Sequence, residues 1–147
     1  MLLLEIGKRE RIELAPPDFD DIEKLTNKVR DICSGADHDK MSEMCVIIDE
    51  LVNNYISYSF TGVENPHLSV DVEYINGTAT LTFTNNGVLF NPIEAKPIDV
   101  DVDISERTPG GVGIMLVKQF SEKMEYSVVD GKNELKIIKK MTVDNNS

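Results

Sequence analysis

The chain has 147 residues, the usual length of a single domain, and one domain over residues 1–147 is expected. Hydrophobic residues make up 41% and charged residues 28% of the sequence, which is typical of a globular protein and excludes a disordered or fibrous class. The formal net charge of −11 argues against direct nucleic-acid binding, because so acidic a surface repels a phosphate backbone.

The N-terminal half predicts a strand followed by two helices. A strand is expected within residues 1–14. Asp18 is a suitable N-cap for the first helix, whose apolar residues recur every three or four positions until Gly35 ends it. The second helix is expected to begin near Asp39. Its apolar stripe consists of Met41, Met44, Cys45, Ile48, Leu51, Val52, Tyr55 and Ile56.

Downstream of residue 67 the apolar residues alternate instead of following a helical period. Residues 68–74 and 78–83 are separated by Asn76-Gly77, a pair typical of a two-residue hairpin turn. The connection that follows, residues 86–110, is longer than compact domains usually allow. A lid over a site and a solvated acidic loop both explain such a connection.

The remainder of the chain predicts a helix and a second hairpin. The helix is expected over residues 111–122, and two strands follow over 124–129 and 134–139, joined by a turn at 130–133. Residues 142–147 form a polar tail that we expect to be frayed. This order of elements predicts an α+β fold: a two-layer α/β sandwich in which helices cover one face of a mostly antiparallel mixed sheet.

Sequence features also bear on location and on metal binding. No apolar run approaches ~18 residues, so no membrane association is expected, and a cytoplasmic location follows. Cys33 and Cys45 are expected to be small core residues. Their spacing to His38 and His67 does not suit a metal site, and no local motif supports a Cys-His nucleophile.

One motif that could carry chemistry lies on the second predicted helix. Glu50 and Asn54 are four residues apart and therefore share a helix face. A carboxylate stacked with a carboxamide can act as a general base beside a Mg²⁺ ligand, whereas a solvated polar face is the alternative. The apolar residues Ile47 and Tyr58 intrude on the same face, which indicates that another part of the chain covers it.

A second motif ends the first hairpin. Asn85 and Gly87 close its return strand, and the Asn-Asn-Gly sequence there is also a favourable turn. By itself this motif does not distinguish a binding residue from a turn residue.

A third motif is the glycine-rich segment that opens the third predicted helix. Gly110, Gly111 and Gly113 allow backbone N–H groups to approach an anion at the helix N-terminus. Arg107 could add a forked phosphate contact. The segment is not a P-loop, and Leu116 breaks the dinucleotide-binding pattern.

Taken together, the order and spacing of these motifs resemble the GHKL ATPase fold shared with histidine kinases. Within that fold, the chain is most similar to the small stand-alone anti-sigma factor serine/threonine kinases. Residues 87–92, 106–117 and 125–137 carry this likeness, which extends over about residues 18–141.

The resemblance implies an ATP- and Mg²⁺-dependent serine kinase. Glu50 would be the base for phosphoryl transfer, and Asn54 would bind Mg²⁺. Asn85 and Gly87 would contact the adenine. The glycine-rich segment would bind the phosphates, and the long connection would form a lid over them. The residues implied to bind ATP are Asn54, Asn85, Gly87, Arg107, Gly110, Gly111 and Gly113.

The same resemblance implies partners. The substrate would be a Ser hydroxyl on an anti-anti-sigma protein of the STAS type, and a sigma factor would be sequestered by a homodimer of the kinase. A plain ATP hydrolase is an alternative. The catalytic half of a two-component histidine kinase is disfavoured, because the chain has no room for a helical phosphoacceptor hairpin.

Asn85 departs from the family pattern, which usually has Asp at this position. The Asn carbonyl still accepts a hydrogen bond, but the charge is lost. Losing a charged acceptor costs about 1–3 kcal/mol, which corresponds to a roughly ten- to hundredfold loss of nucleotide affinity. A non-catalytic regulatory binding module with weak or lost nucleotide binding is therefore the alternative function.

Overall fold

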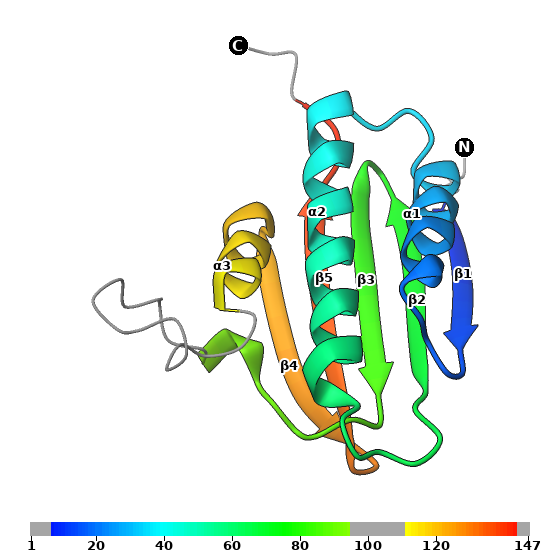
Figure 1. Ribbon diagram of the computed structural model, residues 1–147. Helices are drawn as coiled ribbons and strands as arrows, with labels where there is room; N and C mark the ends of the chain where they lie inside the picture. Colours follow the sequence, from blue (N-terminus) through cyan, green and yellow to red (C-terminus); the bar gives the residue numbers. More distant parts are fainter. Residues whose placement is uncertain (1–6, 95–110, 144–147) are drawn as a thin grey trace.

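The computed structural model describes residues 7–94 and 111–143 (Figure 1). Its elements in chain order are β1 (Gly7–Leu14), α1 (Asp20–Ile32), α2 (His38–Asn54), a π-helical turn (Tyr55–Ser59), β2 (Leu68–Ile75), β3 (Thr78–Asn85), a 3-10 turn (Pro92–Glu94), α3 (Gly111–Phe120), β4 (Lys123–Val129) and β5 (Lys132–Lys140). The five strands form one sheet in the order β1-β2-β3-β5-β4.

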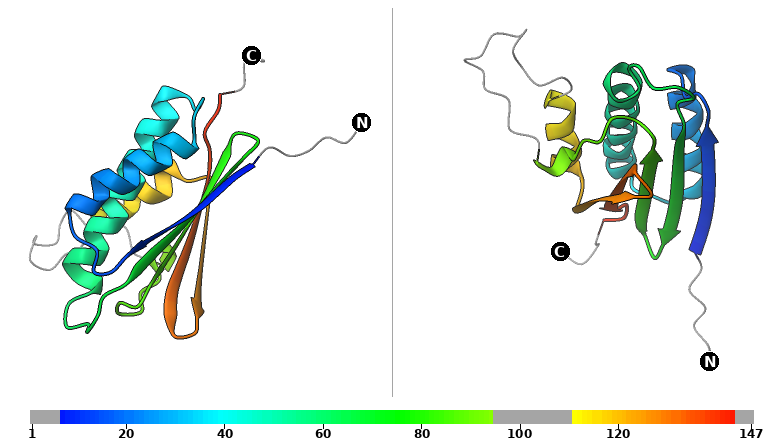
Figure 2. Two further views of the ribbon diagram at one scale, coloured as in Figure 1. Left: turned by 90° about the vertical axis from the view of Figure 1, so that its right-hand side faces the viewer. Right: turned by 90° about the horizontal axis from the view of Figure 1, so that it is seen from below.

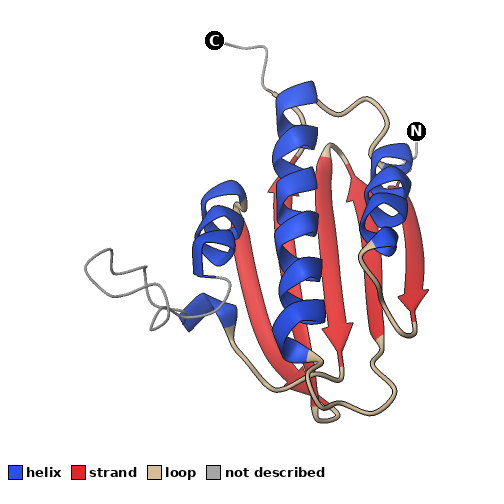
Figure 3. Ribbon diagram, in the orientation of Figure 1, coloured by secondary structure: helices blue, strands red, loops and turns tan. Residues whose placement is uncertain are grey.

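The predicted α+β sandwich is confirmed. All three α-helices lie on one face of the sheet (Figures 2 and 3). Every neighbouring strand pair of the described sheet is antiparallel. The prediction of a mixed sheet is therefore wrong, whereas its mostly antiparallel character is confirmed. No helix in residues 7–94 and 111–143 is long and apolar enough to cross a membrane.

Alternation along the strands divides the sheet into an apolar and a polar face. The apolar face packs beneath the helices because alternate side chains of a strand point to the same side. Its fully buried residues on the three central strands include Leu68, Val70, Leu81, Phe83, Leu135 and Ile137. The edge strand β1 differs, since four of its eight positions, Lys8, Arg9, Glu10 and Arg11, form a continuous charged run.

Two tight turns set the strand register. Both residues of Asn76-Gly77 have positive φ, at 51° and 78°, and so do both residues of Asp130-Gly131, at 52° and 77°. Two successive positive φ values are typical of a type I′ turn, which suits the twist of the flanking strands. The predicted four-residue turn at 130–133 is therefore wrong, because Asp-Gly alone completes it and Asn133 belongs to β5.

The two long helices begin differently. The N-cap of α1 is Phe19, without a side-chain cap, and not Asp18 as predicted. Asp18 lies one residue earlier, where the N–H of Asp21 donates to Asp18 Oδ1 (3.1 Å) and the N–H of Asp18 donates to Asp21 Oδ2 (2.8 Å). In α2 the cap is Asp37, whose side chain accepts from the N–H groups of Asp39 and Lys40. The helix therefore starts slightly earlier than predicted.

A buried lysine anchors the C-terminal end of α3. Lys139 of β5 is 1% exposed and its Nζ donates to the carbonyl of Phe120, the last residue of α3 (2.6 Å). The same ammonium forms an ion pair with Glu43 of α2 (3.5 Å). Lys139 therefore links the two helices that carry most of the predicted site to the sheet beneath them.

Candidate functional site

The two helices with the predicted chemistry pack against each other. Gly113, in the first turn of α3, lies so close to Glu50 of α2 that a Cβ at this position would collide with Glu50 Oε2. The carboxyl group thus lies beside a helix N-terminus, where unpaired N–H groups favour negative charge. Packing of α3 on α2 also explains why Ile47 is fully buried, as its place on a polar face indicated, whereas Tyr58, expected to be covered as well, is exposed.

Asn54 carries an unused acceptor one turn beyond Glu50. The residue is 8% exposed, and its Oδ1 is the only buried side-chain nitrogen or oxygen of the described residues without a hydrogen-bond partner. Leaving such an atom unpaired costs about 1–3 kcal/mol, so a donor or a cation that is not part of the chain would be stabilised by contacting it. A carboxamide oxygen is a ligand that Mg²⁺ accepts.

The π-helical turn that follows Asn54 brings Ser59 against the end of β3. The carbonyl of Ser59 accepts from the N–H of Val88 (2.9 Å). A Cβ on Gly87 would lie 2.7 Å from the same carbonyl oxygen, so only glycine fits at this position. Turns of this kind are frequent at functional sites. Here the turn joins the C-terminal end of α2 to the loop that leaves β3.

Asn85, at the end of β3, is 1% exposed and lies beneath this loop. Its Oδ1 accepts two hydrogen bonds, from the N–H of Gly87 (2.9 Å) and from Nδ2 of Asn133 (3.1 Å). Asn133 is directly opposite Asn85 in the pairing of β3 with β5. The predicted Asn85 and Gly87 therefore share one hydrogen-bond network with a residue that the sequence prediction did not include.

Asn133 is the centre of that network. Its Nδ2 also donates to the carbonyls of Gly87 (3.3 Å) and Val88 (3.0 Å). Its Oδ1 accepts from the N–H of Phe90 (3.0 Å) and from the hydroxyl of Tyr126 (2.6 Å). Sequence reasoning missed Asn133 because it was assigned to a turn; treating Asp-Gly as a complete turn would have placed it in the strand, facing the helices.

A small cavity lies between α2, α3 and this network. It is lined by polar groups of Asn54, Ser59, Tyr126 and Asn133 together with apolar side chains such as Ile114. Its volume of about 10 Å³ holds roughly one water molecule, so a larger ligand requires the lining to move. Tyr55, buried above β3, has its pKa raised by burial and remains a neutral phenol.

Of the remaining predicted site residues, some lie within the described part of the structure and others lie outside it. Gly111 is the first residue of α3. Arg107, Gly110 and most of the predicted lid, residues 95–110, lie outside the described residues. Within the described residues no group of three or more His, Cys, Asp and Glu side chains could hold a metal ion, so a cation here would depend on oxygens such as that of Asn54.

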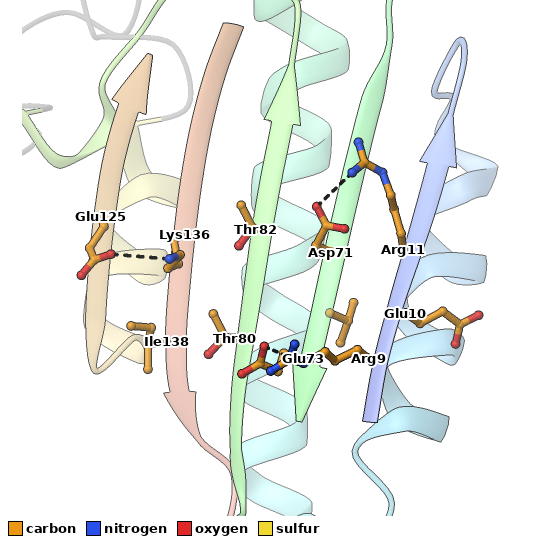
Figure 4. A pocket seen from close by; sticks show the side chains of 11 residues that line it. Arg9, Glu10, Arg11, Asp71, Glu73, Thr80, Thr82, Glu125, Lys136 and Ile138 are labelled. Carbon is orange, nitrogen blue, oxygen red and sulfur yellow. Dashed lines mark ion pairs between the residues drawn. The ribbon is translucent and has the colours of Figure 1, made fainter. Parts of the chain in front are cut away.

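A wider and shallower hollow lies on the opposite face of the sheet (Figure 4). It has a volume of about 570 Å³ and is lined by side chains that pair across strands, among them Arg9 with Glu73 (3.1 Å) and Lys136 with Glu125 (4.0 Å). None of the predicted site residues that the structure describes lines it. The candidate chemistry is therefore on the helical side of the sheet.

Residues 15–139 match the model of a protein family described as the histidine kinase-like ATPase domain. This chain belongs to that family. The GHKL resemblance seen in the sequence is thereby confirmed. The unpartnered oxygen of Asn54 fits a Mg²⁺·nucleotide, the ligand expected of a histidine kinase-like ATPase.

Two proteins illustrate the relationships of this histidine kinase-like ATPase domain. It is 26% identical over 87 residues to the serine/threonine-protein kinase BtrW of Bordetella bronchiseptica, a match that spans 59% of this chain and 61% of BtrW. It superposes on the crystal structure of the RsbU and RsbW domains of Rv1364c from Mycobacterium tuberculosis with a TM-score of 0.61 and 11% identity, covering 92% of this chain and 33% of that chain. At this level of identity, the similarity to the crystal structure shows a shared fold and nothing further.

Proposed function

We propose that this domain is an ATP- and Mg²⁺-dependent serine kinase of the anti-sigma type. The observation that carries the proposal is that the Glu50 carboxylate lies against Gly113 at the start of α3, one helical turn from the unpartnered Oδ1 of Asn54. Phosphoryl transfer needs mainly positioning and charge stabilisation, which these groups supply. The similarity to BtrW, a serine/threonine-protein kinase, supports the same class of activity.

Each residue of the proposed site has a separate task. Glu50 takes the proton of the substrate Ser hydroxyl. Asn54 offers its Oδ1 to Mg²⁺, and the N–H groups at the start of α3, from Gly111 to Gly113, bind phosphate oxygens. When bound, Mg²⁺·ATP supplies the phosphoryl group. Arg107 and Gly110 are proposed for the same phosphates.

The proposed partners follow from the resemblance to anti-sigma kinases. The Ser substrate belongs to an anti-anti-sigma protein of the STAS type, and a homodimer sequesters a sigma factor in the cytoplasm to regulate transcription. Light scattering of the protein with and without a sigma factor measures the stoichiometry, and a monomer that leaves the sigma factor free contradicts this part of the proposal.

The test of the kinase proposal combines binding and transfer. Mg²⁺·ATP is titrated calorimetrically into the natural protein and into Glu50→Gln, and phosphate transfer to a STAS-type protein is followed by mass spectrometry. Glu50→Gln is expected to bind Mg²⁺·ATP and to transfer no phosphate. Asp49→Asn removes the same charge from the neighbouring exposed residue and is expected to keep both properties. Transfer by Glu50→Gln at the natural rate would show that Glu50 is not the base.

A second candidate is a non-catalytic regulatory module of the same fold. It is favoured by Asn85, whose oxygen is already engaged, and by the small volume of the neighbouring cavity. Such a module would bind its protein partner equally well with ATP, with ADP and without nucleotide. A gain in partner affinity on adding Mg²⁺·ATP would exclude this candidate.

A further inference from the structure

The open face of the sheet carries a row of five side chains, one from each strand (Figure 4). The strand register pairs them side by side in the order Arg11, Asp71, Thr82, Lys136 and Glu125, from β1 through β2, β3 and β5 to β4. The row therefore reads positive, negative, neutral, positive, negative. Reversing its order about β3 turns every charge into the opposite charge.

The hollow on this face is balanced in charge although the chain is acidic. Glu10 borders it, but the carboxylate of Glu10 forms an ion pair with Lys28 of α1 (2.8 Å). The other charged side chains lining the hollow are three basic and three acidic ones: Arg9, Arg11, Lys136, Asp71, Glu73 and Glu125. Because the net charge of the chain is −11, its excess of negative charge lies outside these six residues. Two copies that meet here avoid much of the repulsion between acidic molecules.

The open face is exposed and large enough for a specific contact. Its six charged side chains are between 40% and 73% exposed, and the three α-helices lie on the opposite side of the sheet (Figure 2). Five strands about 4.8 Å apart and about 25 Å long offer roughly 600 Å² per copy. Two copies would bury roughly 1,200 Å², which is the lower end of the range for specific interfaces.

The direction of a twofold axis decides which strands meet. Sheets that pack face to face keep their strand directions within about 30° of each other. An axis parallel to β3 places β3 on β3, β2 on β5 and β1 on β4 of the second copy, so that the order of the row is reversed. Arg11 then faces Glu125 of the second copy, and by symmetry this contact occurs twice. Asp71 faces Lys136 of the second copy in the same way. An axis perpendicular to the strands would instead bring like charges together.

We propose that two copies of this domain pack through their open sheet faces about a twofold axis parallel to β3. The inference rests on the homodimer of the proposed function and assigns a surface to it. Uncharged Thr82 lies at the centre of that surface. Charge pairs across an interface determine which surfaces meet more than they determine the stability of each chain.

The neighbouring row contains an exception to this complementarity. There Arg9 faces Lys123 of the second copy, which is a contact between like charges. Both side chains are already paired within their own chain. Arg9 forms an ion pair with Glu73 (3.1 Å), and Lys123 forms one with Glu125 (2.9 Å). The central row therefore contributes the specificity of the contact.

The experiment uses the reversal of the central row. Arg11→Glu and Glu125→Arg each place like charges opposite one another twice in a dimer, so each variant alone is expected to dimerise at least about tenfold more weakly than the natural protein. In an equimolar mixture, the new carboxylate at position 11 of one copy faces the new guanidinium at position 125 of the other. The second contact of this mixed dimer is the natural one. The mixture is therefore expected to recover the natural dissociation constant, measured by sedimentation equilibrium over a range of protein concentrations.

A matched pair of variants controls for net charge. Lys24→Glu and Glu23→Arg make the same two changes of charge on exposed positions of α1, on the other side of the sheet. Each is expected to dimerise like the natural protein, alone and mixed. Circular dichroism measures whether each variant is folded, and calorimetry with Mg²⁺·ATP on the same samples tests the nucleotide-binding proposal separately.

The possible results separate this inference from the proposed homodimer. A dimer that neither Arg11→Glu nor Glu125→Arg weakens would overturn the inference and leave the homodimer standing. Weakened variants that do not recover on mixing would have the same meaning. A natural protein that is monomeric at every concentration would overturn both, and in that case loss of binding to a STAS-type protein in Arg11→Glu would assign the face to that partner instead.

Discussion

Gly113 is the residue at which the candidate site tolerates least change. Alanine at this position is compatible with the helix and would raise its propensity by up to about 1 kcal/mol, but its Cβ would collide with Glu50 Oε2. We expect Gly113→Ala to displace the carboxylate, lowering phosphate transfer at least about tenfold while the unfolding temperature changes by a few degrees at most.

Val112 provides the matched control for this substitution. It precedes Gly113 in α3 and is exposed, so Val112→Ala changes the same turn without touching Glu50. Transfer rates and thermal unfolding of the two variants are measured side by side. A Gly113→Ala protein with the natural transfer rate would show that the close approach has no part in the reaction.

The two cysteines differ in their surroundings and should differ in reactivity. Burial raises the pKa of the Cys33 thiol to about 11, whereas Cys45 is only partly buried and accepts a hydrogen bond from Arg30 (3.4 Å). Since the thiolate is the reactive form, iodoacetamide at pH 8 is expected to modify Cys45 well before Cys33. Mass spectrometry of the labelled peptides measures the order, and faster labelling of Cys33 would contradict it.

The Cys33 thiol also predicts a pH dependence of stability. Its pKa is higher in the folded protein than the ordinary value of 9.0, so the unfolded chain loses its proton first. The stabilising contribution of the protonated Cys33 thiol to the free energy of unfolding is therefore complete below about pH 9. It decreases as the pH rises toward 11. Urea unfolding between pH 8 and pH 10 should show a smaller loss of stability in Cys33→Ala than in the natural protein.

At the scale of elements, the position of α3 depends on the Lys139 anchor. Lys139→Met removes the bond to the Phe120 carbonyl and the ion pair with Glu43. Because Glu43 is partly exposed and the methionine fills the vacated space, we expect a loss of about 1–3 kcal/mol in the free energy of unfolding. Urea denaturation measures this change.

The same strand offers a control on its other face. Lys136 is half exposed and its pair with Glu125 is long (4.0 Å), so Lys136→Met is expected to change the free energy of unfolding by less than about 0.5 kcal/mol. Equal losses for the two lysine variants would show that burial of Lys139 has no special effect on stability.

Local patterns predicted most elements of this fold. The alternation on either side of Asn76-Gly77 and the apolar stripe of α2 each depend on residues close in sequence, and both predictions hold. The glycine-rich start of α3 was also recognised from the sequence. Its contact with Glu50 was not, because it depends on how closely two helices approach each other.

Other features depended on long-range pairing and were not predicted. The role of Asn133 follows from its register opposite Asn85, 48 positions away, which a turn assignment concealed. The alternation along β5 places Lys139 on the buried face. Lysine is rarely buried without partners, however, and the partners of Lys139 come from α2 and α3. The roles of Glu50, Asn54, Asn85, Gly87, Arg107 and the three glycines remain predictions.

At the scale of the whole molecule, the acidic charge dominates its solution behaviour. The net charge of −11 falls to zero near pH 4.5 as carboxylates gain protons. Molecules without net charge no longer repel one another, so solubility is expected to be lowest within about half a unit of this pH. Turbidity measured from pH 7 to pH 3.5 tests the expectation, and a minimum of solubility above pH 6 would contradict it.

The charged strand β1 has a consequence for aggregation. Its neighbour β2 carries the buried residues Leu68, Val70 and Val72, and its edge on that side is paired with β1. An exposed apolar strand edge is a template for intermolecular β-pairing, whereas a row of charges discourages it. A chain shortened to begin after Leu14 would present β2 as the new edge, and we expect it to form thioflavin-binding fibrils or inclusion bodies where the longer chain remains dispersed.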